Sequence, residues 1–294
     1  MKEITLFMPA KINLSIDVLN RRADGYHYVE MIMQAIDLYD IVRVEKQTSG
    51  ITVKCEHSDV PEDQRNIAWK AAEHFFAELL VQEGPSIEKG ACISIKKAIP
   101  VFAGLGGGST DAAGVLKALN MLYNNCLDGK KLLQISKRLG ADVAFFLRGG
   151  TQKAEGVGEE LTELPEFEGI NLVLVKPDFS VSTPWAYQSL DLNQMGERPD
   201  TAYIVNAIKQ KNINNLASSM RNVLESVTIK EHPEINTIME KMIEYGALGS
   251  RMSGSGPTVF GIFPDEQTAK LAQSKLINEY THVYYNKSIG RGKY

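Results

Sequence analysis

Residues 100–113 read Pro-Val-Phe-Ala-Gly-Leu-Gly-Gly-Gly-Ser-Thr-Asp-Ala-Ala, and this stretch says most about the fold of the 294-residue chain. Four glycines fall between Gly104 and Gly108. Because glycine adopts positive φ at no steric cost, several backbone N–H groups of such a loop can point into one concavity. A helix is predicted from about Ala112 to Tyr123, and its free N-terminal amides attract an anion. The stretch therefore predicts a phosphate-binding loop that needs no lysine.

Two hydroxyl-bearing residues close this loop. Ser109 and Thr110 can cap the predicted helix or place a hydroxyl group on phosphate or Mg²⁺. The loop matches neither of two better-known phosphate-binding patterns. No lysine follows the glycines, as GxxxxGK[ST] requires, and GxGxxG counted from Gly104 ends on Ser109. The alternative is a plain glycine-rich turn in front of a capped helix.

Outward from the loop, hydrophobic periodicity predicts a mixed α+β protein. Polar and apolar residues alternate over Lys11–Val18, the period of a half-buried strand, whereas Asn66–Gln82 has helical spacing. Further strands are predicted at Ile36–Glu45, Ile51–Cys55, Ala91–Lys96, Asn171–Val175, Thr258–Phe263 and His282–Asn286, and further helices at Lys130–Leu139, Pro233–Tyr245 and Asp265–Tyr280. The Gly-, Glu- and Pro-rich stretch Glu155–Gly169 predicts a boundary between an N-terminal domain, residues 1–160, and a C-terminal domain, residues 161–294.

Composition excludes several classes of protein. Hydrophobic residues make up 44% and charged residues 23%, as in ordinary globular proteins. The net charge is −4, from 32 basic and 36 acidic residues, so no overall positive field favours nucleic acid or acidic lipid. No 18 consecutive residues are apolar, so no membrane-spanning helix is predicted. Pro9 interrupts the short apolar stretch near the N-terminus, so no signal peptide is predicted either. The cysteines are scattered and the histidines lack metal-ligand spacing. We therefore expect a cytoplasmic protein with no structural metal site, no nucleic-acid partner and no membrane anchor.

Several segments occur in an order that is known from one enzyme superfamily. Pro9-Ala-Lys-Ile-Asn-Leu14, the 100–113 loop and Gly249-Ser-Arg-Met-Ser-Gly-Ser-Gly-Pro-Thr-Val-Phe260 resemble the three motifs of the galactokinase–homoserine kinase–mevalonate kinase–phosphomevalonate kinase superfamily. Two more segments, Arg22-Ala-Asp-Gly-Tyr-His-Tyr28 and Leu139-Gly-Ala-Asp-Val-Ala-Phe-Phe146, resemble one family within it, the 4-diphosphocytidyl-2-C-methyl-D-erythritol kinases. The resemblance spans the chain from Lys11 to Phe260. Thr110 stands where serine is usual, and it keeps the hydroxyl group.

The resemblance implies the two-lobe α+β fold of these small-molecule kinases, with the active site in the cleft between the lobes. The implied reaction transfers the γ-phosphoryl group of ATP to the 2-hydroxyl of 4-diphosphocytidyl-2-C-methyl-D-erythritol, in the non-mevalonate pathway to isoprenoid precursors. Mg²⁺ would arrive with ATP and be held mainly by the phosphates. The partner is then a small cytidyl diphosphate molecule, and the enzyme is a monomer or weak homodimer. The alternatives are another kinase of the superfamily, such as a homoserine or mevalonate kinase, and a nucleotide-binding protein that has lost turnover.

The resemblance also assigns catalytic and ATP-binding residues. Taken by themselves, Lys11 and Asn13 share one face of a strand, and Asp142 follows a helix as a cap or turn residue would. The resemblance makes Asp142 the base that takes the proton of the hydroxyl, with Lys11 beside it. It places Gly254-Ser-Gly256, otherwise a tight turn, near the triphosphate as a support for the first loop. The implied ATP site consists of Pro100, Val101, Phe102, Ala103, Gly104, Leu105, Gly106, Gly107, Gly108, Ser109 and Thr110.

The substrate site is implied in the same way. Tyr26 and His27 follow an Asp-Gly turn and could be core or surface filler. In the family, the matching tyrosine stacks on cytosine and the histidine hydrogen-bonds the edge of the base. A second aromatic residue closes the other face of the ring, and either Tyr187 or its neighbour Trp185 matches it. The implied substrate-binding set is Asn13, Tyr26, His27, Asp142, Thr183 and Tyr187.

Overall fold

Two long antiparallel strands, β1 (Glu3–Arg21) and β2 (His27–Gln47), form the centre of the larger sheet. The protein is seen here as a computed structural model, which describes residues 2–84 and 89–292. The larger sheet has the order β3-β4-β2-β1-β8, and β5 pairs with both β2 and β6. Three register shifts between β1 and β2, at Pro9/Ala10, Asn13/Ser15 and Val18/Asn20, mark irregularities of the kind that bend a hairpin. The remaining strands of this sheet are β3 (Ser49–Cys55), β4 (Lys89–Lys96), β5 (Thr151–Glu155), β6 (Glu160–Glu163) and β8 (Arg221–Asn222).

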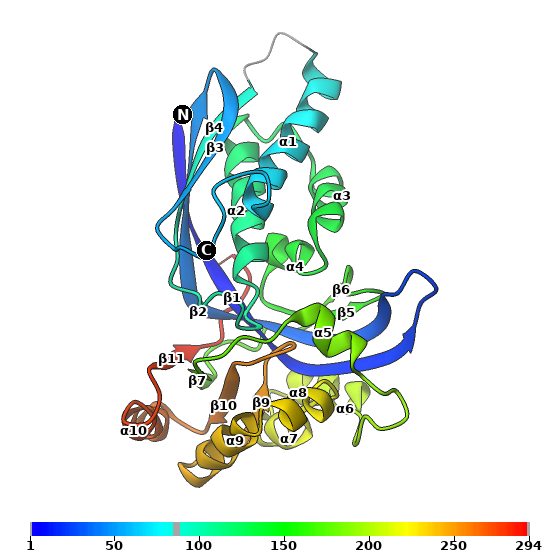
Figure 1. Cartoon of the computed structure of the whole chain (residues 1–294), viewed down its shortest axis with the longest axis vertical. Coiled ribbons are helices and arrows are strands. Elements are labelled where there is room, and N and C mark those ends of the chain that lie inside the picture. Colours follow the sequence, from blue (N-terminus) through cyan, green and yellow to red (C-terminus); the bar gives the residue numbers. More distant parts are fainter. Residues whose placement is uncertain (1, 85–88, 293–294) are drawn as a thin grey trace.

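Four helices cover one face of this sheet, in the upper half of Figure 1. They are α1 (Ile67–Glu83), α2 (Gly107–Leu122), α3 (Gly129–Leu139) and α4 (Val143–Arg148). Helix α2 packs against both β1 and β2 and against α1. Buried alanines such as Ala72 and Ala113 let backbones approach closely, and the rings of Phe75, Phe145 and Phe146 fill the core.

A smaller antiparallel sheet with the order β11-β7-β10-β9 forms the second lobe, in the lower half of Figure 1. Its strands are β7 (Asn171–Lys176), β9 (Gly249–Met252), β10 (Val259–Phe263) and β11 (His282–Lys287). Its helices are α5 (Thr183–Gln188), α6 (Thr201–Lys209), α7 (Ile213–Ser219), α8 (Glu225–Glu231), α9 (Glu234–Glu244) and α10 (Glu266–Leu276). The predicted two-lobe α+β fold is therefore confirmed.

The two lobes share part of their core. Ile12 and Ile32 from the larger sheet belong to the same buried cluster as Leu174 and Phe260 from the smaller one. The chain also returns to the first lobe near its end, because the backbone N–H of Ile289 donates to the carbonyl of Ala35 at 2.9 Å. The predicted domain division at residue 160 falls at the first residue of β6, which belongs to the larger sheet, and it stays a prediction.

The start of α2 differs from the prediction. The helix begins at Gly107, five residues before Ala112, and Gly106 is its N-cap with φ 77°. Glycine disfavours helix, so the sequence marks the start where the alanines begin, but packing overrides this preference. Ser109 and Thr110 consequently lie inside the first turn, which excludes the first of their two predicted roles, capping the helix. In the part of the chain that the structure covers, no helix is both long and apolar enough to cross a membrane.

Candidate active site

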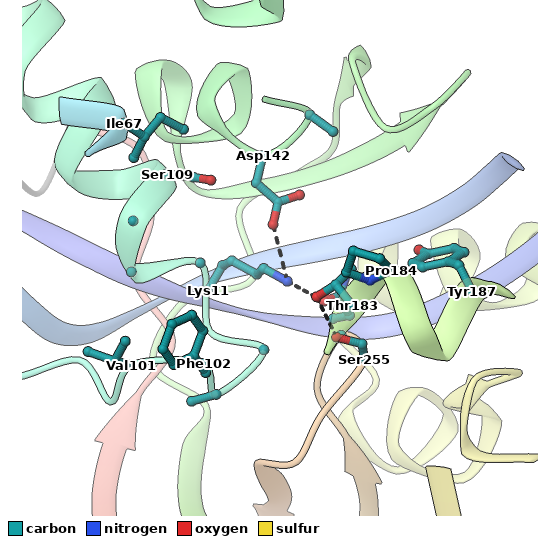
Figure 2. A pocket seen from close by; sticks show the side chains of 18 of the residues that line it. Lys11, Ile67, Val101, Phe102, Ser109, Asp142, Thr183, Pro184, Tyr187 and Ser255 are labelled. Atoms are coloured by element: carbon teal, nitrogen blue, oxygen red, sulfur yellow. Dashed lines mark hydrogen bonds and ion pairs between the residues drawn. The ribbon is translucent and has the colours of Figure 1, made fainter. Parts of the chain in front are cut away.

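A cavity of about 910 Å³ lies between the lobes. Its walls come from β1, the tip of the β1–β2 hairpin, the segment before α1, the glycine loop, the start of α4, α5 and the segment between β9 and β10. Residues far apart in sequence, such as Lys11, Asp142 and Ser255, therefore meet at one place (Figure 2). This agrees with the expected position of the site.

The glycine loop forms one wall of this cavity. Gly104 and Gly106 have φ of 76° and 77°, the left-handed region that favours glycine. A Cβ atom at Gly104 would lie 2.2 Å from the carbonyl oxygen of Ser253, so no other residue fits there without movement. All the residues expected to bind ATP line the cavity except Leu105 and Thr110, which are 1% and 0% exposed and lie in the core. Their side chains therefore face away from the cavity, and the expectation that these two residues belong to the ATP site stays a prediction.

The segment between β9 and β10 is hydrogen-bonded to the glycine loop. The Ser253 hydroxyl donates to the carbonyl of Gly104 at 3.1 Å and accepts the backbone N–H of Asn13 at 3.3 Å. The Asn222 side chain in turn donates to the carbonyl of Gly254 at 2.8 Å. These contacts join β1, the glycine loop and the late glycine segment (Gly254–Gly256) into one hydrogen-bonded unit. The shape of the loop therefore depends on both lobes.

Lys11 and Asp142 point toward one another in the cavity and form an ion pair, as Figure 2 shows. The ammonium of Lys11 lies 3.5 Å from Asp142 Oδ2 and donates to Asn13 Oδ1 at 2.6 Å. Lys11 is 4% exposed, whereas the side chain of Asp142 is 26% exposed. Asp142 occupies the N-cap position of α4, yet its side chain makes no capping hydrogen bond. Its carboxylate is thus held by a buried cation and open to the cavity, an arrangement suited to accepting a proton.

Aromatic side chains gather at the other end of the cavity. The His27 and Tyr187 rings lie 5.6 Å apart at an interplanar angle of 33°, and Tyr26 beside them is 67% exposed. Tyr187 lines the cavity and Trp185 does not, so the geometry favours Tyr187 as the second aromatic wall. Burial, and then the charge of Arg21, lowers the pKa of His27, so this imidazole is neutral at pH 7.

Two hydroxyl groups meet beside these aromatic residues. Thr183 Oγ1 lies 2.8 Å from Ser255 Oγ, and both residues line the cavity. Burial, with the charge of Asp142 adding to it, raises the pKa of Tyr187, whose hydroxyl therefore stays protonated. This end of the cavity thus offers neutral donors and acceptors close to the carboxylate of Asp142.

A buried charge cluster lies under the first turn of α2 and is not apparent from the sequence. The ammonium of Lys97 contacts the carboxylates of Asp40 and Asp111, the latter at 2.7 Å, and all three side chains are almost fully buried. A Cβ atom at Gly107 would lie 3.2 Å from this ammonium, so the cluster touches the glycine loop. Burial raises the pKa of Asp111, and the negative charge of Asp40 acts in the same direction. In the sequence, Lys97 and Asp111 lie on either side of the glycine loop, and this is the only local indication of the cluster. The contact of Lys97 with Asp40 cannot be predicted from the sequence.

Comparison with known proteins identifies two family matches. Residues 66–150 match the model of the GHMP kinases N terminal domain, and residues 204–282 match that of the GHMP kinases C terminal region. A 4-diphosphocytidyl-2-C-methyl-D-erythritol kinase of Acetivibrio thermocellus is 51% identical over 289 residues, covering 98% of this chain and 100% of the relative. One from Clostridium botulinum is 43% identical over 280 residues, covering 95% and 98%.

Solved structures agree with these matches. The crystal structure of a 4-(cytidine 5'-diphospho)-2C-methyl-D-erythritol kinase superposes with a TM-score of 0.81 at 32% identity, covering 98% of this chain and 100% of that one. The crystal structure of homoserine kinase from Cytophaga hutchinsonii superposes with a TM-score of 0.79 at 20% identity, covering 99% and 96%. The second likeness shows the shared fold alone.

Proposed function

The chain belongs to the GHMP kinases and, within them, to the 4-diphosphocytidyl-2-C-methyl-D-erythritol kinase family, and from this we propose how its cavity carries out the reaction. The enzyme is a phosphotransferase that uses ATP and an alcohol acceptor in the non-mevalonate route to isoprenoid precursors. In our proposal the γ-phosphoryl group of ATP passes to the 2-hydroxyl of the cytidyl substrate. The observation that carries this proposal is the position of the Lys11–Asp142 pair between the glycine loop and the aromatic end of the cavity.

The triphosphate of ATP lies on the glycine loop in this proposal. Backbone amides at Gly106–Gly108 and the N-terminal end of α2 supply dipoles that favour the phosphate charges. Helix α2 is 16 residues long and packs against β1 and β2, so its N-terminal amides are already in position at the cavity before a ligand binds. Binding at a preformed site of this kind needs little reorganisation.

Mg²⁺ fits the oxygen-rich neighbourhood of this loop. Ser109 lines the cavity in the first turn of α2, and Asp142 presents its carboxylate across from it, both hard oxygen donors. Within residues 2–84 and 89–292 no group of three His, Cys, Asp or Glu side chains could hold a metal ion. We therefore propose that the phosphates supply most ligands, with Ser109 as the protein's contribution. When bound, Mg²⁺ neutralises charge on the phosphoryl oxygens.

Asp142 acts on the substrate hydroxyl in the proposed mechanism. Its carboxylate accepts the proton as the oxygen attacks, or orients that oxygen where the transition state is loose. Lys11, 3.5 Å from this carboxylate, offsets the negative charge that develops on the transferring group. Asn13 holds the ammonium of Lys11 in place through their 2.6 Å hydrogen bond.

The cytidyl group lies at the aromatic end of the cavity in this proposal. Tyr26 stacks on the cytosine ring, neutral His27 hydrogen-bonds its edge, and Tyr187 closes the other face. Thr183 and Asn13 contact the methylerythritol part.

The cytoplasmic location and the monomeric or weakly dimeric state of the enzyme stay predictions.

A panel of acceptors tests the function directly. ADP release is measured with the cytidyl substrate, with homoserine, with mevalonate and with no acceptor. We expect turnover with the cytidyl substrate at a rate well above the other three. Equal turnover with homoserine or mevalonate would assign the chain to another branch of the superfamily, and nucleotide binding without turnover would identify a non-catalytic binding protein.

A further inference from the structure

Arg21 stands at the rim of the cavity, next to the aromatic end. It is the last residue of β1, and it pairs directly across the antiparallel ladder with His27. Side chains of directly opposed residues leave the hairpin on the same face, with Cβ atoms about 5 Å apart. Both residues line the cavity. The guanidinium of Arg21 can therefore reach a ligand whose base lies on His27.

The guanidinium of Arg21 is not paired with a carboxylate in the part of the chain that the structure describes. Among residues 2–84 and 89–292, the side chain of Arg21 has no hydrogen-bonding or ion-pair partner. The adjacent arginine behaves differently, because Arg22 donates to both oxygens of Asp24 and lies 5.1 Å from the Tyr28 ring centroid. Arg22 thus organises the turn, whereas the guanidinium of Arg21, the last residue of the strand, is left for a ligand.

The other cations around the cavity already have anionic partners. Lys11 is paired with Asp142, Lys97 with Asp111 at 2.7 Å, and Arg65 with Asp63 at 2.8 Å. Of the lysines and arginines in the described lining, Arg21 is thus the one without a carboxylate partner. A ligand that brings several negative charges to the aromatic end would find its counter-ion there.

We propose that Arg21 binds the diphosphate group of the cytidyl substrate and so distinguishes a cytidine diphosphate from cytidine itself. The proposal rests on the proposed function, which places cytosine on His27. A guanidinium presents parallel N–H groups that match two phosphate oxygens, which an ammonium cannot do. The diphosphate is joined to the base through one ribose, so it lies within the reach of a side chain adjacent to the base site.

Calorimetry with CDP and cytidine tests this assignment. The wild type is expected to bind CDP more tightly than cytidine. In Arg21→Gln, CDP affinity should fall by about tenfold to a hundredfold, the range for losing one charged hydrogen-bonding partner, while cytidine affinity changes less than about twofold. Arg21→Lys should fall between the two. In steady-state assays Arg21→Gln should raise the KM for the cytidyl substrate and leave kcat and the KM for ATP nearly unchanged.

Arg65→Gln is the matched control, because it removes the same charge from the cavity lining beside α1 and should keep the wild-type ratio of CDP to cytidine affinity. If Arg21→Gln also keeps that ratio, with an unchanged melting temperature, the assignment of Arg21 is wrong and the proposed function stands. If the wild type binds neither CDP nor cytidine, the cytidyl site itself is wrong and the role of Arg21 is overturned with it. The two failures are therefore distinguishable.

Discussion

At the scale of single residues, the chemistry depends on a carboxylate that lies beside a cation and is still open to the cavity. Asp142 meets these conditions because Lys11 lies 3.5 Å away and because no capping bond to α4 occupies its oxygens. Asn13 holds the lysine from its other side. A change to Asp142 or Lys11 should therefore affect turnover more than ligand affinity.

Asp142→Asn tests the base. The amide keeps the size of the side chain but removes the charge and the proton acceptor, so kcat should fall by about 10²- to 10⁴-fold. Affinities for ATP and the cytidyl substrate should change far less, because neither the glycine loop nor the aromatic end is altered. Lys11→Met should also lower kcat, and the double variant should lose less than the product of the single losses if the pair acts as a unit. Near-wild-type kcat in a correctly folded Asp142→Asn would remove this residue from the mechanism.

Tyr26→Ala tests the cytosine stack. Loss of one ring should weaken binding of the cytidyl substrate by roughly 1–3 kcal/mol and leave ATP affinity unchanged, as measured by calorimetry. Tyr28→Ala is the control, since this tyrosine is also exposed on the hairpin but contacts Arg22 rather than the cavity. A fall in ATP affinity for Tyr26→Ala would instead place Tyr26 in the nucleotide site.

Single residues also show which parts of the site the sequence can predict and which it cannot. Lys11, Asp142, Tyr26 and His27 could be assigned because each lies in a short contiguous motif. The charge cluster of Lys97 could not, because its partner Asp40 is 57 positions away and only the folded chain joins them. Arg21 pairs with His27 in the ladder and lines the cavity, whereas Arg22 pairs with Asp24, and the sequence alone does not distinguish the two arginines in this way.

At the scale of elements, the decisive feature is the glycine-rich N-terminus of α2. Sequence periodicity locates this helix but starts it too late, because Gly107 and Gly108 have low helix propensity and their place in the first turn is set by packing. Substituting Gly106 would not isolate the role of the loop. A Cβ atom there would lie 2.6 Å from the ring of Phe146, which is fully buried, so the fold would change as well.

Gly108→Val is the better test of phosphate binding by this element. Gly108 has ordinary φ, and a Cβ atom there would meet only Ile67, at 3.6 Å, so the helix accepts a side chain. Because the residue lines the cavity, the added methyl groups should displace the phosphates and weaken ATP binding at least tenfold. Gly129→Val makes the same change in the first turn of α3, where a Cβ atom meets nothing within 4 Å, and it should bind ATP normally. Normal ATP affinity in both variants would contradict the phosphate site.

Glu225, which is hydrogen-bonded to the strand that leads into the late glycine segment, makes the free energy of unfolding dependent on pH. Its Oε1 accepts the backbone N–H of Met252 at 2.9 Å, and burial raises its pKa to about 7, although Arg251 and that N–H act in the opposite direction. The unfolded chain releases this proton near pH 4.5, so between pH 4.5 and 7 the folded state binds more protons. The free energy of unfolding should therefore fall as pH rises through this window, by roughly 3 kcal/mol, and then level off.

Glu225→Gln checks this dependence by urea denaturation at pH 5, 6, 7 and 8. Glutamine still accepts the Met252 N–H but does not titrate, so its advantage over the wild type should grow with pH and stop growing above about pH 7. Glu231→Gln, at the exposed end of α8, should follow the wild-type curve. If Glu225→Gln also ran parallel to the wild type, the buried carboxyl would not be the titrating group.

At the scale of the whole molecule, the site exists because the two lobes are built around one strand pair. Lys11 and Asn13 lie in the middle of β1, where the strand contacts the glycine loop and the late glycine segment. The order of the motifs was enough to predict two lobes and a cleft between them. The shared core was not predictable, because Ile12 and Leu174 each belong to an ordinary apolar strand and only the tertiary arrangement brings them together.

This shared core predicts that the lobes unfold together, although the composition of Glu155–Gly169 predicts a boundary between two domains. Calorimetry should give one transition, with the calorimetric enthalpy equal to the van't Hoff enthalpy. Leu174→Ala removes fully buried atoms from the smaller sheet, at a cost of about 2–5 kcal/mol, so it should lower the single melting temperature by roughly 5 °C. Leu271→Ala, at a position 57% exposed on α10, should melt like the wild type. Two separate transitions, or a variant in which only one of them moves, would show instead that residues 1–160 and 161–294 fold as separate units and meet only at the cleft.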